Sequence, residues 1–130
     1  MKTLLVDDDH IQRRLYEKIF ERHGFELDVS CCQEALLLDW SKYDTVLVDV
    51  MMPDIAGHDL IRSVAQRIGM RNMPHVVLFS VLDAGRLAEL ATGLHDDGIE
   101  AGYQTKFNGH AITMQNLLGI INDGHKNSTR

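Results

Sequence analysis

The chain has 130 residues, a length that fits one domain with a single hydrophobic core. Hydrophobic residues make up 45% and charged residues 25% of it, the composition of an ordinary soluble globular domain. The net charge of −6 gives no support for direct nucleic-acid binding, and no apolar run approaches the roughly 20 residues of a membrane span.

The cysteines and the N-terminus indicate the cellular compartment. Cys31 and Cys32 are neighbours in sequence, and such neighbours rarely form a disulfide with each other. The N-terminus leads straight into an apolar strand and then into acids, which is not the pattern of a signal peptide. We therefore expect a cytoplasmic protein with reduced thiols.

Short apolar runs alternate with helical patterns, beginning with a strand at residues 2–6. Asp9 and Gln12 have the spacing of a helix N-cap, so a helix should start there. Apolar residues recur every four positions along this helix and predict its buried face: Ile11, Leu15 and Ile19. Residues 25–30 alternate like a half-buried edge strand.

The middle of the chain predicts a short helix at residues 33–40 and a strand at residues 45–49. This strand is apolar without alternation, which is typical of a strand covered on both faces. A longer helix follows and ends at Gly69. Its apolar stripe consists of Leu60, Ile61, Val64 and Ile68.

The last part of the chain predicts a strand at residues 75–79, a helix capped by Asp83, and a short strand at residues 102–105. The apolar residues of the helix after Asp83 should face the core: Leu87, Leu90, Ala91 and Leu94. A final helix is marked by Met114, Leu117, Leu118 and Ile121. We place the domain at residues 1–123 and take residues 124–130 as a polar tail or the start of a linker.

This pattern contains five β–α units, which predicts an α/β fold with a parallel sheet covered on both faces. The natural arrangement is the flavodoxin-like, doubly wound (βα)5 fold with strand order 2-1-3-4-5. In that order the first and third strands are neighbours. Asp7, Asp8 and Asp49, which follow these strands, then meet at one edge of the sheet.

Carboxylates that meet at one edge repel each other, and a divalent cation removes the repulsion. An all-oxygen site formed by Asp7, Asp8 and Asp49 suits Mg²⁺. An aspartate can also act as a nucleophile and hold a phosphoryl group as an acyl phosphate. Ser80 and Lys106 end the fourth and fifth strands, so both should project towards the same edge and towards such a group.

These residues carry a resemblance that covers nearly all of residues 2–122. The chain resembles a receiver domain of two-component response regulators. The matching stretches are residues 4–9, 48–57, 78–80 and 103–106.

The resemblance implies that Asp49 accepts a phosphoryl group from the phosphohistidine of a sensor histidine kinase or histidine phosphotransfer protein. It implies that Asp8, Asp49 and the backbone carbonyl of Met51 bind Mg²⁺ directly, and that Asp7 helps through water. Such a domain assists its own phosphorylation and dephosphorylation but is not an enzyme for an external substrate.

The resemblance also implies a switch. Ser80 would bind the phosphoryl group and move on activation, Lys106 would pair with Asp49 or its phosphate, and Tyr103 would change rotamer. The output face would be the fourth helix, fifth strand and fifth helix. It would act on a downstream protein target or a covalently linked output domain, or form a homodimer, with no direct contact to nucleic acid or membrane.

The chain departs from the family pattern near the switch. Phe107 stands where the family usually has proline after the lysine, so we expect a trans bond there. Val81 stands where a small residue is usual. Met51 and Leu82, at the positions that tune loss of the phosphoryl group, cannot orient an attacking water. Residues 95–101 lengthen the connection before the fifth strand.

Three alternatives stay open. A pseudo-receiver would bind proteins without phosphorylation; Phe107, Val81 and the long connection favour it, whereas the complete set of acids argues against it. A haloacid-dehalogenase-type phosphatase would use residues 7–9 as its Asp-x-Asp motif, but Ile11 stands where that motif has threonine. A flavodoxin-like FMN carrier is disfavoured because the acidic loop after the first strand would repel phosphate.

Overall fold

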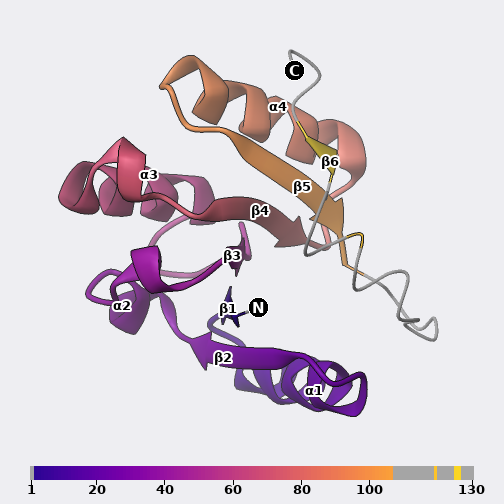
Figure 1. The fold of residues 1–130 in the computed structure, drawn as a ribbon. Coiled ribbons are helices and arrows are strands. Elements are labelled where there is room, and N and C mark those ends of the chain that lie inside the picture. The colour runs from indigo at the N-terminus through magenta and orange to yellow at the C-terminus, as the bar shows by residue number, and fades with distance from the viewer. Residues whose placement is uncertain (1, 107–118, 120–124, 127–130) are drawn as a thin grey trace.

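The computed structural model describes residues 2–106, 119, 125 and 126, which contain a sheet covered by helices (Figure 1). The strands are β1 (Lys2–Val6), β2 (Glu26–Ser30), β3 (Thr45–Val48), β4 (His75–Ser80), β5 (Ala101–Thr105) and β6 (His125–Lys126). The helices are α1 (His10–Arg22), α2 (Cys32–Ala35), α3 (Gly57–Ile68) and α4 (Ala84–Asp96), with the 3-10 turns η1 (Trp40–Lys42) and η2 (Met70–Asn72). None of these helices is long and apolar enough to cross a membrane.

The first five strands are parallel and follow the order β2-β1-β3-β4-β5, so the predicted topology is confirmed. In their register Val6 lies beside Val48, and Val48 lies beside Leu78. The loops after these strands therefore emerge together at one edge of the sheet. β6 pairs with β5 in the antiparallel direction, which the polar composition of residues 124–130 did not indicate.

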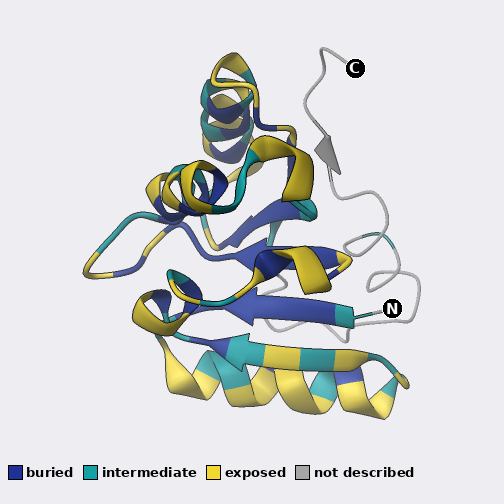
Figure 2. Cartoon of the chain, turned by 60° about the vertical axis from the view of Figure 1, so that its left-hand side comes forward, coloured by how far each residue is buried: buried dark blue, intermediate teal, exposed yellow. Residues whose placement is uncertain are grey.

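The central strands bury side chains on both faces, which explains why β3 shows no alternation. One face packs against α1 through Leu5, Leu47, Val77 and Phe79. The other packs against α2, α3 and α4 through Leu4, Val6, Val46, Val48, Val76 and Leu78. Figure 2 shows this layering as buried strands between helices whose outer surfaces are exposed.

The predicted buried face of α1 is wrong for Ile11 and Leu15, whereas Ile19 is partly buried and packs against the core. Ile11 is 67% exposed and Leu15 is 47% exposed, whereas Tyr16 and Phe20 are buried. The helix carries two apolar stripes, and the aromatic one buries more surface against the sheet. The Tyr16 ring packs edge-on against Phe79, with 5.1 Å between centroids.

The predicted helix at residues 33–40 is shorter than expected, because α2 ends at Ala35. Trp40 is fully buried, and its indole N–H donates to the carbonyl of Ala35 at 3.0 Å. Asp39 then caps η1 by accepting from the N–H of Ser41. Burying a tryptophan so close to the helix end requires the chain to turn, which overrides the helical preference of the leucines.

The remaining elements lie close to their predicted positions. Gly69 ends α3 with φ of 91°, and Asp83 caps α4 by accepting from the N–H of Arg86. The predicted final helix around residues 114–121 and the Lys106–Phe107 bond lie outside the described residues.

Gly57 controls how closely α3 approaches the end of β3. A Cβ atom at this position would collide with the backbone carbonyl of Asp49 and would lie 3.0 Å from Cγ1 of Val48. The N–H of Gly57 also donates to the carbonyl of Val50 at 3.0 Å. Only glycine therefore lets α3 start directly against the backbone that carries Asp49.

Gly57→Ala is expected to lower the free energy of unfolding by about 1–3 kcal/mol, because the new methyl group must push backbone atoms apart. Urea unfolding measures this change. Gly93→Ala in α4 is the matched control. Its Cβ would meet only the flexible end of Arg62, at 3.4 Å, so it should be neutral or stabilising. Equal stability of Gly57→Ala and wild type would show that the contact is relaxed in solution.

Candidate functional site

The acidic loops meet as the topology requires. Asp7 and Asp8 follow β1, and Asp49 follows β3. Ser80 ends β4, and Lys106 follows β5 beside it. A cavity of about 530 Å³ opens at this edge. It is lined by Asp7, Asp8, Asp9, Gln12, Asp49, Met51, Pro53, Val81 and Lys106.

Asp7 is buried, and its backbone and side chain are fully hydrogen bonded. Its N–H donates to the carbonyl of Ser30, at the end of β2, and its own carbonyl accepts from Nη1 of Arg13 at 2.7 Å. Its Oδ1 accepts from the N–H of Asp9 at 2.9 Å, and its Oδ2 accepts from Nζ of Lys106 at 2.6 Å. Asp7 therefore fixes the loop that follows β1 and holds Lys106 in place.

Asp49 is buried but less completely neutralised. Its Oδ1 accepts from the N–H of Met51 at 3.2 Å, and its Oδ2 lies 3.5 Å from Nζ of Lys106. Burial raises the pKa of Asp49 above its ordinary value, and the nearby charge of Asp7 adds to this rise, while Lys106 opposes it. The side chains around it therefore only partly compensate the charge of the ionised carboxylate.

Ser80 and Tyr103 lie on neighbouring strands: Ser80 ends β4, and Tyr103 lies within β5. The Oγ of Ser80 is fully buried and has no hydrogen-bond partner among the described residues. The N–H of Lys106 donates to the carbonyl of Ser80 at 2.8 Å, which ties the end of β5 to that of β4. Tyr103 pairs with Leu78 across the strands and packs against the larger core cluster.

Asp8 lines the same cavity as Asp49, but both of its carboxylate oxygens are bonded to Cys32. Its Oδ1 accepts from the N–H of Cys32 at 2.7 Å, and its Oδ2 accepts from the Cys32 thiol at 3.2 Å. Asp7, Asp8 and Asp49 do not converge; among the described residues, the group with three potential ligand atoms within 4.8 Å is Asp8, Cys32 and Asp54.

The start of α2 explains this orientation. Cys31 occupies the N-cap position but its side chain does not cap the helix, so Asp8 satisfies the first backbone N–H of the helix instead. Burial raises the pKa of the Cys32 thiol to about 11, with a further contribution from Asp8. The thiol therefore stays protonated at neutral pH and can donate to the carboxylate.

Sequence analysis missed three residues that shape the site: Arg13, Cys32 and Gly57. One signal was available for Cys32. Because β2 pairs with β1, the residues after Ser30 must lie beside those after Val6. Arg13 and Gly57 gave no such signal, since an arginine in a helix and a glycine at a helix start have many ordinary roles.

The entrance to the cavity is apolar. Met51 is 62% exposed and Val81 is 54% exposed, and both line the opening above Asp49. Leu82 instead turns inward and packs against the core. Val81 therefore stands where it can narrow access to Asp49, as the sequence suggests.

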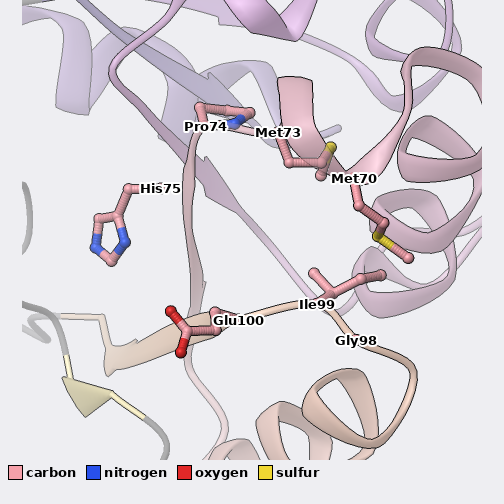
Figure 3. A pocket seen from close by; sticks show the side chains of 7 residues that line it. All are labelled: Met70, Met73, Pro74, His75, Gly98, Ile99 and Glu100. Atoms are coloured by element: carbon pink, nitrogen blue, oxygen red, sulfur yellow. The ribbon is translucent and has the colours of Figure 1, made fainter. Parts of the chain in front are cut away.

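A second cavity, of about 400 Å³, lies at the opposite edge of the sheet, near the start of β4. Figure 3 shows Met70, Met73 and Ile99 on one side of this region, with the imidazole of His75 directed away from both methionines. The cavity is bordered by the connection between α4 and β5 and lies away from Asp49. We therefore place the functional site at the carboxyl edge. The prediction of a long connection at residues 95–101 is wrong in its bounds, because α4 runs to Asp96 and β5 begins at Ala101, which leaves residues 97–100 between them.

Comparison with known proteins agrees with this geometry. Residues 3–98 match the response regulator receiver domain. The chain belongs to this family. Receiver domains of this kind occur in response regulators and in sensor proteins of two-component signalling systems.

Two curated relatives illustrate this range. The receiver domain is 33% identical to response regulator SaeR of Staphylococcus epidermidis over 60 residues, 45% of this chain and 26% of that protein. It is 34% identical to the sensory/regulatory protein RpfC of Xanthomonas campestris over 82 residues, 60% of this chain and 11% of that protein. The match thus spans a minor part of each relative.

Solved structures share the fold. Chemotaxis protein CheY4 of Vibrio cholerae superposes with a TM-score of 0.69 at 19% identity, covering 90% of this chain and 92% of that one. The receiver domain of Francisella response regulator 1452 superposes with a TM-score of 0.63 at 28% identity, covering 81% and 83%.

Asp49→Asn is expected to stabilise the receiver domain at neutral pH in the absence of divalent cations. The pKa of Asp49 in the folded protein lies above its ordinary value of 3.8, so its stabilising contribution is lost as the pH rises through the folded pKa. Lys106 keeps Asp7 as its partner in the variant. Urea unfolding in EDTA should give a gain over wild type that grows with pH and then levels off.

Asp96→Asn is the control, because it removes one negative charge from an exposed position at the end of α4. Its stability difference from wild type should not follow the same pH curve. A wild-type domain that gains stability over Asp49→Asn as the pH rises would contradict the unfavourable burial of the Asp49 charge.

Proposed function

We propose that this receiver domain is a phospho-switched signalling module that accepts a phosphoryl group on Asp49. The observation that carries the proposal is the setting of Asp49 itself. It lies at a cavity edge with a lysine 3.5 Å from one oxygen and with the buried hydroxyl of Ser80, which no described residue bonds within hydrogen-bond geometry, at the end of the neighbouring strand. The donor would be a phosphohistidine of a sensor histidine kinase or a histidine phosphotransfer protein.

In the proposed transfer an Asp49 oxygen attacks the phosphorus atom and forms the acyl phosphate bond. The phosphorus–nitrogen bond of the donor breaks, and the imidazole nitrogen keeps the electron pair and takes up a proton. The ammonium of Lys106 would balance charge on the phosphoryl oxygens, and the hydroxyl of Ser80 would donate to one of them. The domain thus assists its own phosphorylation and dephosphorylation without acting as an enzyme on another substrate.

Receiver domains generally bind Mg²⁺, and the donor set in this chain fits that ion. Asp7, Asp8, Asp49 and the carbonyl of Met51 supply only oxygen atoms, which a hard cation prefers. Asp49 and Met51 would bind directly and Asp7 through water, while Asp8 must first turn away from Cys32. Bound Mg²⁺ would supply the positive charge that phosphoryl oxygens at Asp49 require.

The expected output follows from the connection between the two switch strands. Ser80 and Lys106 are joined by a backbone hydrogen bond of 2.8 Å, so movement of the serine towards a phosphoryl group acts on the end of β5. Tyr103 lies on the same strand and would change rotamer. The surface formed by α4, β5 and the helix expected after β5 would then bind a downstream protein, a linked output domain or a second copy.

Incubation with a small phosphodonor such as acetyl phosphate and Mg²⁺ is expected to add one phosphoryl group to wild type. Intact-mass measurement detects it, and hydroxylamine should remove it because the bond is an acyl phosphate. Asp49→Asn should abolish labelling, whereas Asp96→Asn, far from the cavity, should retain it.

The same experiment tests the pseudo-receiver alternative. Its favouring observation is that both carboxylate oxygens of Asp8 are bonded to Cys32. Absence of labelling in wild type, together with no Mg²⁺-dependent change in its NMR spectrum, would reject the phosphoryl-acceptor function in favour of that alternative.

The phosphorylated state is expected to be long-lived, because the side chains two positions beyond Asp49 and Ser80 cannot orient a water molecule. Met51 lines the cavity and Leu82 packs into the core. Met51→Asn should shorten the acyl-phosphate lifetime several-fold, since an amide can position an attacking water. Met70→Asn, at an exposed site by the second cavity, should leave the lifetime unchanged. Equal lifetimes in all three proteins would contradict this role of Met51.

A further inference from the structure

We propose that Cys32 is a positioning residue that lowers the Mg²⁺ affinity of the receiver domain by holding the carboxylate oxygens of Asp8 in hydrogen bonds. This inference rests on the proposed function, because it concerns a ligand of the Mg²⁺ site. It adds the first residue of α2 to that site and predicts how metal binding reaches this helix.

Two hydrogen bonds from Cys32 hold the carboxylate of Asp8. The Cys32 backbone N–H donates to Oδ1 at 2.7 Å, and the thiol donates to Oδ2 at 3.2 Å, so both carboxylate oxygens are engaged. Cys32 is 1% exposed, which shields the thiol bond from competing water. A carboxylate oxygen that accepts a hydrogen bond has less electron density to offer a cation, and freeing Oδ2 for a cation requires breaking the thiol bond.

The thiol bond is the part that a side-chain substitution can remove. Cys32→Ala keeps the backbone N–H, so Oδ1 stays anchored while Oδ2 becomes free to bind the cation. Cys32→Ser keeps a donor of similar size and reach. The two variants therefore separate the hydrogen bond from the general effect of altering a buried side chain.

Release of Asp8 should be visible at Trp40. α2 has only four residues, and its first N–H depends on Asp8 because Cys31 provides no side-chain cap. Its last residue, Ala35, accepts the indole N–H of Trp40 at 3.0 Å. A shift of α2 on metal binding thus changes the surroundings of the only tryptophan.

Cys31 offers a matched control beside Cys32. Its thiol donates to Oε1 of Glu34, at 3.3 Å, whereas the thiol that donates to Asp8 is that of Cys32. Cys31→Ala removes a thiol from the same turn of the chain. It should leave the Mg²⁺ affinity unchanged.

The experiment is a MgCl₂ titration of wild type, Cys32→Ala, Cys32→Ser and Cys31→Ala at constant ionic strength. Binding is followed by Trp40 emission and independently by the NMR shifts of the backbone amides of residues 7–9 and 49–51. We expect Cys32→Ala to bind Mg²⁺ about 3- to 10-fold more tightly than wild type, the effect of losing one competing hydrogen bond. Cys32→Ser should bind as wild type or more weakly.

The outcomes separate this inference from the proposed function. If all four proteins bind Mg²⁺ equally, or if Cys32→Ala and Cys32→Ser change the affinity alike, the positioning role is wrong and the receiver function stands. If none of them responds to Mg²⁺, both are wrong. Tighter binding by Cys32→Ala with wild-type behaviour of Cys32→Ser and Cys31→Ala supports the inference.

Discussion

The buried carboxylate of Asp7 is the constraint on which the carboxyl edge of this domain depends. It is 1% exposed, and its backbone and side-chain atoms join the end of β2, the N-cap Asp9, α1 through Arg13, and the end of β5 through Lys106. A buried charge without such partners would be costly, so each of these segments is needed where it lies. The geometry of the loops around Asp49 follows from this requirement.

The ammonium group of Lys106 lies closer to Asp7 than to Asp49, and this difference separates the roles of the two acids. Its ammonium lies 2.6 Å from Asp7 but 3.5 Å from Asp49, and it also lies 5.9 Å from the centre of the Phe79 ring. Asp7 is therefore neutralised by a short ion pair and has mainly a structural role. Asp49 keeps a weaker partner and a raised pKa, so it is the carboxylate that gains most from a cation or from conversion to an acyl phosphate.

The sequence predicts the strands and their order well because buried parallel strands are apolar runs that end clearly at polar or turn-forming residues. It fails where two apolar patterns compete. On α1 the aliphatic stripe of Ile11 and Leu15 is as regular as that of Tyr16 and Phe20, and only packing against Phe79 decides between them. The functional site, too, has features that the sequence predicts and features that it does not. Acids at strand ends can be placed from topology, but the orientation of Asp8 depends on a helix start in a different β–α unit, which local pattern cannot reveal.

The connection between α4 and β5, residues 97–100, bears on how a signal could leave the site. Asp97 pairs with Arg62 of α3 at 2.7 Å, Gly98 adopts φ of 84°, and Ile99 is buried in the larger core cluster. The end of α4 is thus fastened to α3 as well as to β5, although the ion pair is partly exposed and contributes little by itself. Movement of β5 driven from Ser80 would meet resistance at this end of α4. The start of α4, which follows Ser80 closely in the chain and is capped by its own Asp83, is then the part of the helix freer to respond.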